Sequence, residues 1–163
     1  SLTSAQTAAQ WLDGSLNARG WVEVGLVGVS VAILLPLALW MSRALGAMVM
    51  GDDLATGLGV KVERTRLCMI AIGIALVSIA TAATGPIAFV ALAAPQIARK
   101  LTRGSGIGIG AAALMGAAIV LVGDVVAQRI FAPTQLPVGV VTGSLGGIYL
   151  IWLLVTEWKR NRE

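Results

Sequence analysis

Residues 43–66, RALGAMVMGDDLATGLGVKVERTR, form the longest charge-bearing segment between two uncharged hydrophobic runs. Seven charged residues lie within it, whereas residues 24–42 before it and residues 67–98 after it contain none. Each flanking run is long enough to meet a lipid bilayer. We therefore expect residues 43–66 to be a loop on one side of a membrane.

The spacing of apolar residues within this loop predicts two short helices. The first shares one face through Leu45, Met48 and Val49, and the second through Leu54, Ala55 and Leu58. Gly51 separates the two helices, Asp52 or Asp53 is expected to cap the second, and Gly57 and Gly59 suit its termination. Ordered helices with apolar faces favour a docking surface for a partner at the membrane. The alternative is two amphipathic turns that lie on membrane lipid headgroups.

Composition limits the class of protein. The chain has 163 residues, of which 57% are hydrophobic and 12% charged, and its mean hydropathy is +0.87. These values predict one all-α transmembrane domain over residues 1–163. The net charge of +4 does not indicate nucleic acid, because the basic residues sit in short clusters between hydrophobic runs, as the positive-inside rule requires. The first ten residues do not resemble a signal peptide, so we expect a missing upstream part.

The residue types also limit the chemistry. Cys68 is the lone cysteine and histidine is absent, which removes the commonest metal-binding and nucleophilic constellations. We expect no catalytic site, cofactor or metal. Ionisable residues are absent from the middle of every predicted span, which disfavours a secondary transporter that powers itself. Energy for any transport is then expected to come from a partner.

The uncharged run at 67–98 is too long for one crossing. As a single helix it would measure about 48 Å, against a hydrocarbon core of about 30 Å. Gly85-Pro86 is the predicted break, which leaves a span at about 67–84 and a shorter helix at about 87–99. The other predicted spans are residues 24–42, with Pro36 as the expected kink site, the run at 104–123 and the last span at about 136–156. Small residues at four-residue spacing predict a helix-packing face in each of the last two spans, namely Gly108, Ala112 and Gly116, and Gly139, Gly143 and Gly147.

Basic residues define the predicted topology. Ten of the twelve fall into three groups, 43–66, 99–103 and 159–162, and only Arg19 and Arg129 lie elsewhere. Placing the three groups in the cytoplasm requires two helical hairpins after the first span. About five transmembrane helices follow, with an outer N-terminus and a cytoplasmic C-terminus.

Hydroxyl-bearing residues such as Thr142 and Ser144 either line a path or bond their own helix backbone.

Three motifs resemble a known family. GDDLATGLGV, GPIAFVALAAPQIARKL and LPVGVVTGSLGGIYLIWLL occur in this order in the permeases of ABC importers for ferric siderophores, haem and cobalamin, and WLDGSL resembles their outer segment. The resemblance covers nearly the whole chain. It implies half of a ten-helix type II importer permease, specifically the second half, in the bacterial cytoplasmic (inner) membrane as a multi-pass protein.

The resemblance implies roles for particular residues. The paired coupling helices that contact a cytoplasmic ABC ATPase correspond to Leu45, Met48, Val49, Asp52, Asp53, Leu54, Leu58 and Gly59. The residues expected to dock an extracytoplasmic siderophore-binding protein are Arg129, with Gln128 and Arg19. The last helix, with Thr142 and Ser144, corresponds to the translocation path at the interface with a second permease subunit, identical or different. ATP hydrolysis belongs to the partner, and the chain itself is not an enzyme.

The chain departs from the family pattern at several positions. Many members carry Pro-His where this chain has Pro95-Gln96, Arg at the place of Gln128 and Glu at the place of Gln135, and Arg129 is one residue out of register. Gln96 and the GGIYL sequence resemble the branch that handles catecholate siderophores such as ferric enterobactin. A cobalamin or haem importer of the same architecture is the alternative, and a stand-alone channel or an intramembrane enzyme is the alternative from another class.

Overall fold

The structure, a computed structural model, describes residues 14, 16, 19–103, 108–130 and 137–160. Every regular element in these residues is an α-helix, as the sequence predicted. In chain order they are α2 (Trp21–Val49), α3 (Asp52–Gly57), α4 (Val62–Thr84), α5 (Val90–Thr102), α6 (Ile109–Ile130) and α7 (Val138–Arg160).

Four of the described helices are long and apolar enough to cross a membrane, namely α2, α4, α6 and residues 138–156 of α7. The remaining one of the five predicted transmembrane helices is α5, which has 13 residues and is too short to cross a membrane alone. Little of each span is buried within the chain, and most of the buried apolar side chains are alanines. Small residues let helices approach closely in lipid, while larger apolar side chains face outward. The chain is therefore a multi-pass membrane protein.

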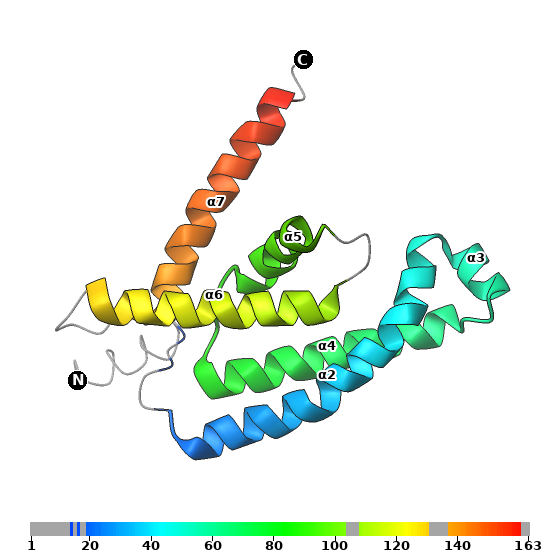
Figure 1. The fold of residues 1–163 in the computed structure, drawn as a ribbon, viewed down its shortest axis with the longest axis horizontal. Helices are drawn as coiled ribbons and strands as arrows, with labels where there is room; N and C mark the ends of the chain where they lie inside the picture. The colour runs from blue at the N-terminus through cyan, green and yellow to red at the C-terminus, as the bar shows by residue number, and fades with distance from the viewer. Residues whose placement is uncertain (1–13, 15, 17–18, 104–107, 131–136, 161–163) are drawn as a thin grey trace, which may run out of the picture.

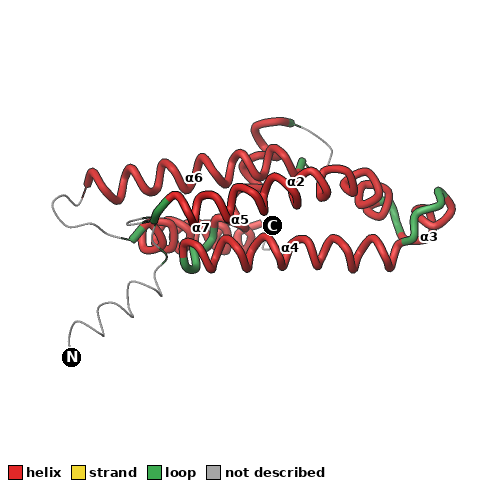
Figure 2. The backbone as a smooth tube through the Cα atoms, turned by 90° about the horizontal axis from the view of Figure 1, so that it is seen from below, coloured by secondary structure: helices red, strands yellow, loops and turns green. Residues whose placement is uncertain are grey.

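The helices form a layer from which one helix departs. Figures 1 and 2 show α2, α4 and α6 running along the same long axis. Contact is most extensive between α5 and α6, followed by α2 with α4. In contrast, α7 begins beside the end of α6 and runs steeply away from the layer (Figure 1). Its later apolar side chains are exposed, among them Ile151, Trp152, Leu154 and Val155.

The predicted break at Gly85-Pro86 is confirmed. α4 ends at Thr84, and the Gly85 amide donates to the Thr81 carbonyl at 2.8 Å, which closes the last turn. Gly85 has a φ of +79°, a left-handed conformation that suits glycine. α5 starts at Val90, three residues later than expected, because residues 86–88 are not helical and Phe89 at the N-cap is left-handed.

Small residues mediate helix contacts, although partly at other positions than expected. A Cβ at Gly116 of α6 would lie 3.6 Å from the Ala94 Cβ of α5, in agreement with the predicted small-residue face of that helix. On α7, the predicted face contains Gly143 and Gly147, where a Cβ would meet nothing within 4 Å. Gly146 is the glycine that contacts a neighbour, because a Cβ there would overlap the Phe89 side chain.

The helix ends before α7 agree with the predicted two-sided arrangement, whereas the end of α7, near the third basic group, lies away from both ends of the layer (Figure 1). α3, the C-terminal end of α5 and the N-terminal end of α6 lie toward one end of the layer, whereas the start of α2 and the ends of α4 and α6 lie toward the other (Figure 1). The first two basic groups, at 43–66 and 99–103, therefore share one end. Retention of such groups on the cytoplasmic side is what the positive-inside rule requires.

This arrangement predicts opposite accessibility for two engineered thiols in a Cys68→Ser background. A cysteine at Ile130, exposed at the end of α6, should react with a membrane-impermeant maleimide in intact cells. A cysteine at Leu101, exposed near the end of α5, should react only after the cells are permeabilised. The measurement is the labelled fraction of each variant, and the reverse pattern would contradict the topology.

Candidate functional site

The end of α2 differs from the sequence prediction. Leu45, Met48 and Val49 were expected in a separate short helix, but α2 continues through them to Val49. The physical reason is that residues 43–49 contain good helix formers and no proline, so the helix continues through the single Gly46. The helix ends at Val49, two residues before Gly51, whose φ of +117° lies outside the region that residues with a Cβ favour.

The second predicted helix is confirmed as α3, but its aspartates do not cap it. Gly51 holds the N-cap position and makes no side-chain capping bond. Asp52 and Asp53 lie in the first turn, where their negative charge suits the positive end of the helix. The Arg66 guanidinium donates to Asp52 Oδ2 at 2.9 Å and forms an ion pair from α4 to the start of α3. Asp52 therefore attaches α3 to α4.

The C-terminal end of α3 is closed as the sequence predicted for Gly59. Gly59 has a φ of +83°, and its amide donates to the Thr56 carbonyl at 2.9 Å. The Val60 amide donates to the Ala55 carbonyl at 3.0 Å, which completes the pair of bonds that defines a Schellman motif. Ala55 is fully buried. Both ends of this short helix are thus fixed by the surrounding chain.

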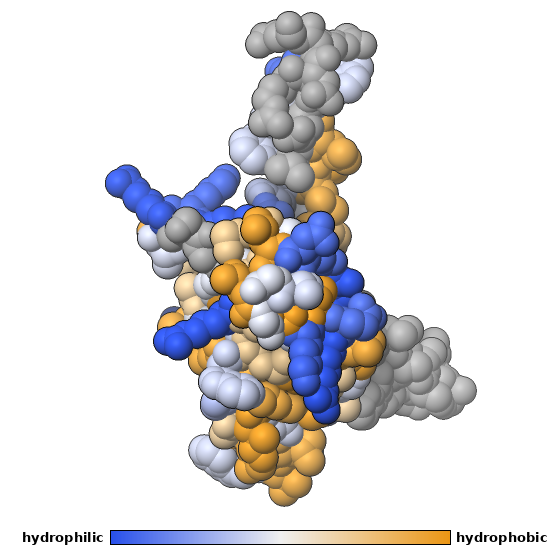
Figure 3. All heavy atoms as spheres, turned by 90° about the vertical axis from the view of Figure 1, so that its right-hand side faces the viewer, coloured by the Kyte–Doolittle hydropathy of each residue, from blue (hydrophilic) through white to orange (hydrophobic). Residues whose placement is uncertain are grey.

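The apolar residues of this segment divide into two sets. Leu45 and Met48 are half-buried within the chain. Val49, Leu54 and Leu58 are 75%, 61% and 68% exposed, so they are available to a partner. Figure 3 views this end of the molecule and shows apolar side chains surrounded by hydrophilic ones. We name Val49, Leu54 and Leu58 the coupling surface.

The predicted outer docking residues lie toward the opposite end of the layer. Arg129 is exposed in the last turn of α6, and Gln128 beside it donates from Nε2 to Asp124 Oδ2 at 2.8 Å. Asp124 therefore pairs with a neighbour on its own helix. Arg19 precedes α2 and is half-buried. The outer segment at 131–136, including Gln135, lies outside the described residues.

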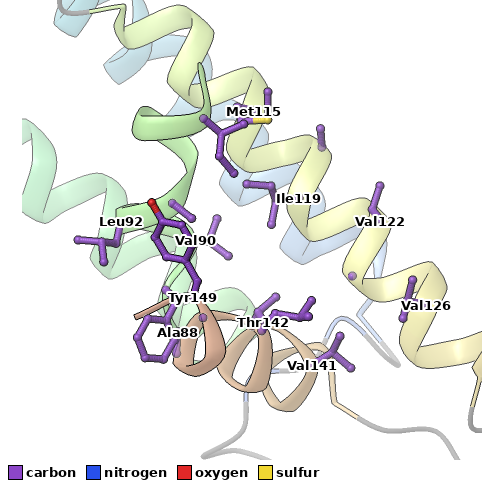
Figure 4. A pocket seen from close by; sticks show the side chains of 17 residues that line it. Ala88, Val90, Leu92, Met115, Ile119, Val122, Val126, Val141, Thr142 and Tyr149 are labelled. Carbon is purple, nitrogen blue, oxygen red and sulfur yellow. The ribbon is translucent and has the colours of Figure 1, made fainter. Parts of the chain in front are cut away.

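An apolar groove of about 430 Å³ lies between α5, α6 and α7. Figure 4 shows side chains of all three helices converging on it. Its lining includes Phe89, Ala93, Ile119, Thr142, Gly146 and Tyr149. Of the two hydroxyls predicted to share a path, Thr142 lines this groove and is buried, whereas Ser144 is exposed elsewhere on α7. The two lie about 200° apart around the helix, so they face different surfaces.

The polar groups of the groove are already hydrogen-bonded. The Thr142 hydroxyl donates to the Gly139 carbonyl at 3.2 Å, and the Tyr149 hydroxyl donates to Gln96 Oε1 at 2.8 Å. Among the residues that the structure describes, no buried side-chain nitrogen or oxygen lacks a partner, and no cluster of potential metal ligands occurs. The groove thus suits apolar groups and offers poor coordination to a metal or an anion.

The sequence interpretation missed the contact between Gln96 and Tyr149. Gln96 was noted only as a departure from the Pro-His pattern, and Tyr149 only as part of GGIYL. The two residues lie 53 positions apart, so no local periodicity connects them. The available signal was chemical: an amide and a phenol in apolar segments each need a hydrogen-bond partner.

Four helices that are long and apolar enough to cross a membrane, with a short helix mounted at one end, fit a membrane transport subunit. The chain belongs to the FecCD transport family, which matches residues 1–156. This match confirms the permease family that the three sequence motifs resemble.

The relatives are permeases of iron and haem transport systems. The ferric enterobactin transport system permease protein FepG of Escherichia coli is 46% identical over 99% of this chain and 49% of its own length. The Fe(3+)-citrate import system permease protein YfmE of Bacillus subtilis is 38% identical over 93% of this chain and 46% of its own. The hemin transport system permease protein HmuU of Yersinia pestis is 32% identical over 93% of this chain and 46% of its own length.

A solved structure shares the fold. An inward-facing conformation of a metal-chelate type ABC transporter matches with a TM-score of 0.82 and 25% identity, over 93% of this chain and 49% of that one. The chain spans about half the length of the curated relatives it matches and aligns with their C-terminal half. The predicted architecture, half of a larger permease, is thereby supported.

The attachment of α3 generates a prediction about two neighbouring aspartates. Asp52→Asn removes the ion pair with Arg66 and should speed backbone amide exchange in residues 55–60 by about two- to threefold, the scale of an exposed ion pair. Asp53→Asn removes the same charge from the same turn but leaves the Asp52–Arg66 ion pair intact, so it should accelerate amide exchange less than Asp52→Asn does. Hydrogen–deuterium exchange of the purified complex measures both variants. Equal acceleration by the two would show that helix charge, and not the pair, orders α3.

Proposed function

We propose that the chain forms part of the membrane permease of an ATP-driven importer that moves a ferric siderophore across the cytoplasmic membrane. The observation that carries this proposal is the coupling surface of Val49, Leu54 and Leu58, held on a fixed short helix in a member of the FecCD transport family. A transport motion can be transmitted only through a rigid element. The Schellman motif and the Asp52–Arg66 pair supply that rigidity.

The energy source follows from the charge pattern. The predicted spans carry no ionisable residue in their middle, so a coupled ion has no ligand or relay there. A cytoplasmic ABC ATPase that binds the coupling surface then supplies the energy. Exposed leucines in a fixed geometry suit such an interface, because burial of apolar surface away from water favours association.

A ferric siderophore is the favoured substrate because the relative with 46% identity is named for ferric enterobactin, and another is named for iron citrate. Haem is the second candidate, supported by the hemin permease at 32% identity. Competition separates the two: unlabelled ferric catecholate, and not haem, should suppress uptake of radioiron chelated by enterobactin in vesicles that contain the complete importer.

The outer and lateral surfaces suit further partners. We assign the exposed Arg129, with Gln128 and Arg19 at the same end, to docking of an extracytoplasmic binding protein, where surface charge steers and orients encounter. The exposed apolar side chains of α7 suit a second permease subunit. Because Thr142 faces the groove while Ser144 is exposed, we assign the translocation path to the Ser144 side of α7.

Leu54→Asp tests the assignment of the coupling surface. A carboxylate at this apolar position would be buried without a partner on ATPase binding, at a cost of about 2 kcal/mol or more, which weakens the complex about 30-fold. We expect the ATPase retained per permease after purification in mild detergent to fall accordingly, and uptake by reconstituted vesicles to fall with it. Insertion into the membrane should be normal.

Leu101→Asp is the matched control, because it places the same charge at a leucine of similar exposure on the same predicted side, 69% against 61% for Leu54. It lies on α5, outside the coupling surface, and should retain the ATPase. If Leu54→Asp keeps wild-type ATPase content and uptake, α3 is only a surface helix and the proposed function loses its main support.

A further inference from the structure

The hydrogen bond between Tyr149 and Gln96 differs from most others in the described helices. Hydroxyls such as those of Thr84, Thr102 and Thr156 donate to carbonyls of their own helix four residues back. Tyr149 instead reaches from α7 to Gln96 of α5, with its oxygen 2.8 Å from Oε1 in a partly buried position. Figure 4 shows Tyr149 at the groove between these helices. The bond therefore connects two elements that are otherwise in limited contact.

A second contact joins the same two helices. The Phe89 side chain sits so close to Gly146 that a Cβ there would overlap it. Phe89 is the N-cap of α5 and has a φ of +66°, a conformation that a bulky residue seldom adopts and that surrounding contacts must hold in place. Glycine at 146 is thus required by the close approach of an aromatic side chain.

Together the two contacts fix an angle, which neither can do alone. Phe89 and Gln96 are seven residues apart, about two turns along one face of α5, and Gly146 and Tyr149 are three apart on one face of α7. A helix held at one point can pivot about it. A helix held at two separate points has a defined crossing angle, and α7 leaves the layer at a steep one (Figure 1).

We propose that Tyr149 and Gln96 form a positioning pair that sets the angle between α5 and α7, with the Phe89–Gly146 contact as its pivot. The Tyr149 hydroxyl and the Gln96 carbonyl oxygen satisfy each other, so the role of the pair lies in the contact between the two helices. Its consequence for transport rests on the proposed function, because the angle of α7 determines where the Ser144 side of this helix lies. A hydrogen bond between membrane helices is weak enough to break and remake, so its loss should change the ratio between the populations with different α5–α7 angles by about three- to fivefold.

The test measures the angle directly as a distance. Spin labels are placed at Lys100 near the end of α5 and at Lys159 near the end of α7, both exposed, in a Cys68→Ser permease within the complete reconstituted importer. Pulsed electron paramagnetic resonance then gives the distribution of distances between the labels. Tyr149→Phe removes only the hydroxyl, and it should add a second distance or broaden the distribution while ATPase content stays at the wild-type level.

Two further variants separate a positioning role from a general structural one. Thr156→Val also removes a hydroxyl from α7, but that hydroxyl donates to the Trp152 carbonyl of its own helix, so the distribution should stay unchanged. Gln96→Glu keeps an acceptor oxygen at the same place and should preserve the wild-type distance. Adding Gln96→Leu to Tyr149→Phe should cause no further change, because both residues act through one bond.

The outcomes are decisive in either direction. A Tyr149→Phe distribution identical to wild type, or one that Thr156→Val reproduces, overturns the positioning pair. A changed distance with uptake per ATPase still at the wild-type level overturns its link to transport, whereas we expect uptake to fall about threefold. Failure of the proposed function appears separately, as retention of the ATPase by Leu54→Asp, and leaves the distance measurement valid.

Discussion

Backbone polar groups inside a bilayer have no water to bond, so a chain that reverses direction there must satisfy them within itself. The chain meets this constraint at residues 84–90, where a 32-residue uncharged run is divided and two helix ends need partners for their backbone groups. The Gly85 amide closes the last turn of α4, and the Phe89 carbonyl accepts the Leu92 and Ala93 amides at the start of α5. The short α5 then packs on α6, and the groove and the contacts with α7 depend on that placement.

The two ends of the layer are built differently. At the end that bears α3, the backbone bonds of the Schellman motif and the Arg66–Asp52 pair fix a short helix, and its leucines remain exposed. Along α7, by contrast, contact with the layer is sparse and large apolar side chains are uncovered. A fixed short helix at one end and a last helix joined to the layer at few points suit the proposed transmission of motion from a cytoplasmic partner to a path through the membrane.

Features with a local chemical signal were predictable from the sequence. The break at Gly85-Pro86, the termination of α3 at Gly59 and the existence of five principal helices each follow from residue types over a few positions. The ion pair of Asp52 and the hydrogen bond of Gln96 were not predictable, because their partners lie 14 and 53 residues away. The small-residue contact of α7 was missed for the same reason. Periodicity predicted Gly143 and Gly147 as contact positions, but Phe89, which is distant in the sequence, packs against Gly146.

Cross-linking from α3 to the ATPase tests the central claim most directly. In a Cys68→Ser permease, a cysteine that replaces Leu58, which is exposed on the coupling surface, is treated with a short bifunctional thiol reagent in membranes that contain the whole importer. The account predicts a covalent product of permease and ATPase that forms from this position and not from a cysteine at Leu101. Equal products from both positions, or none from Leu58 while the ATPase is bound, would contradict it.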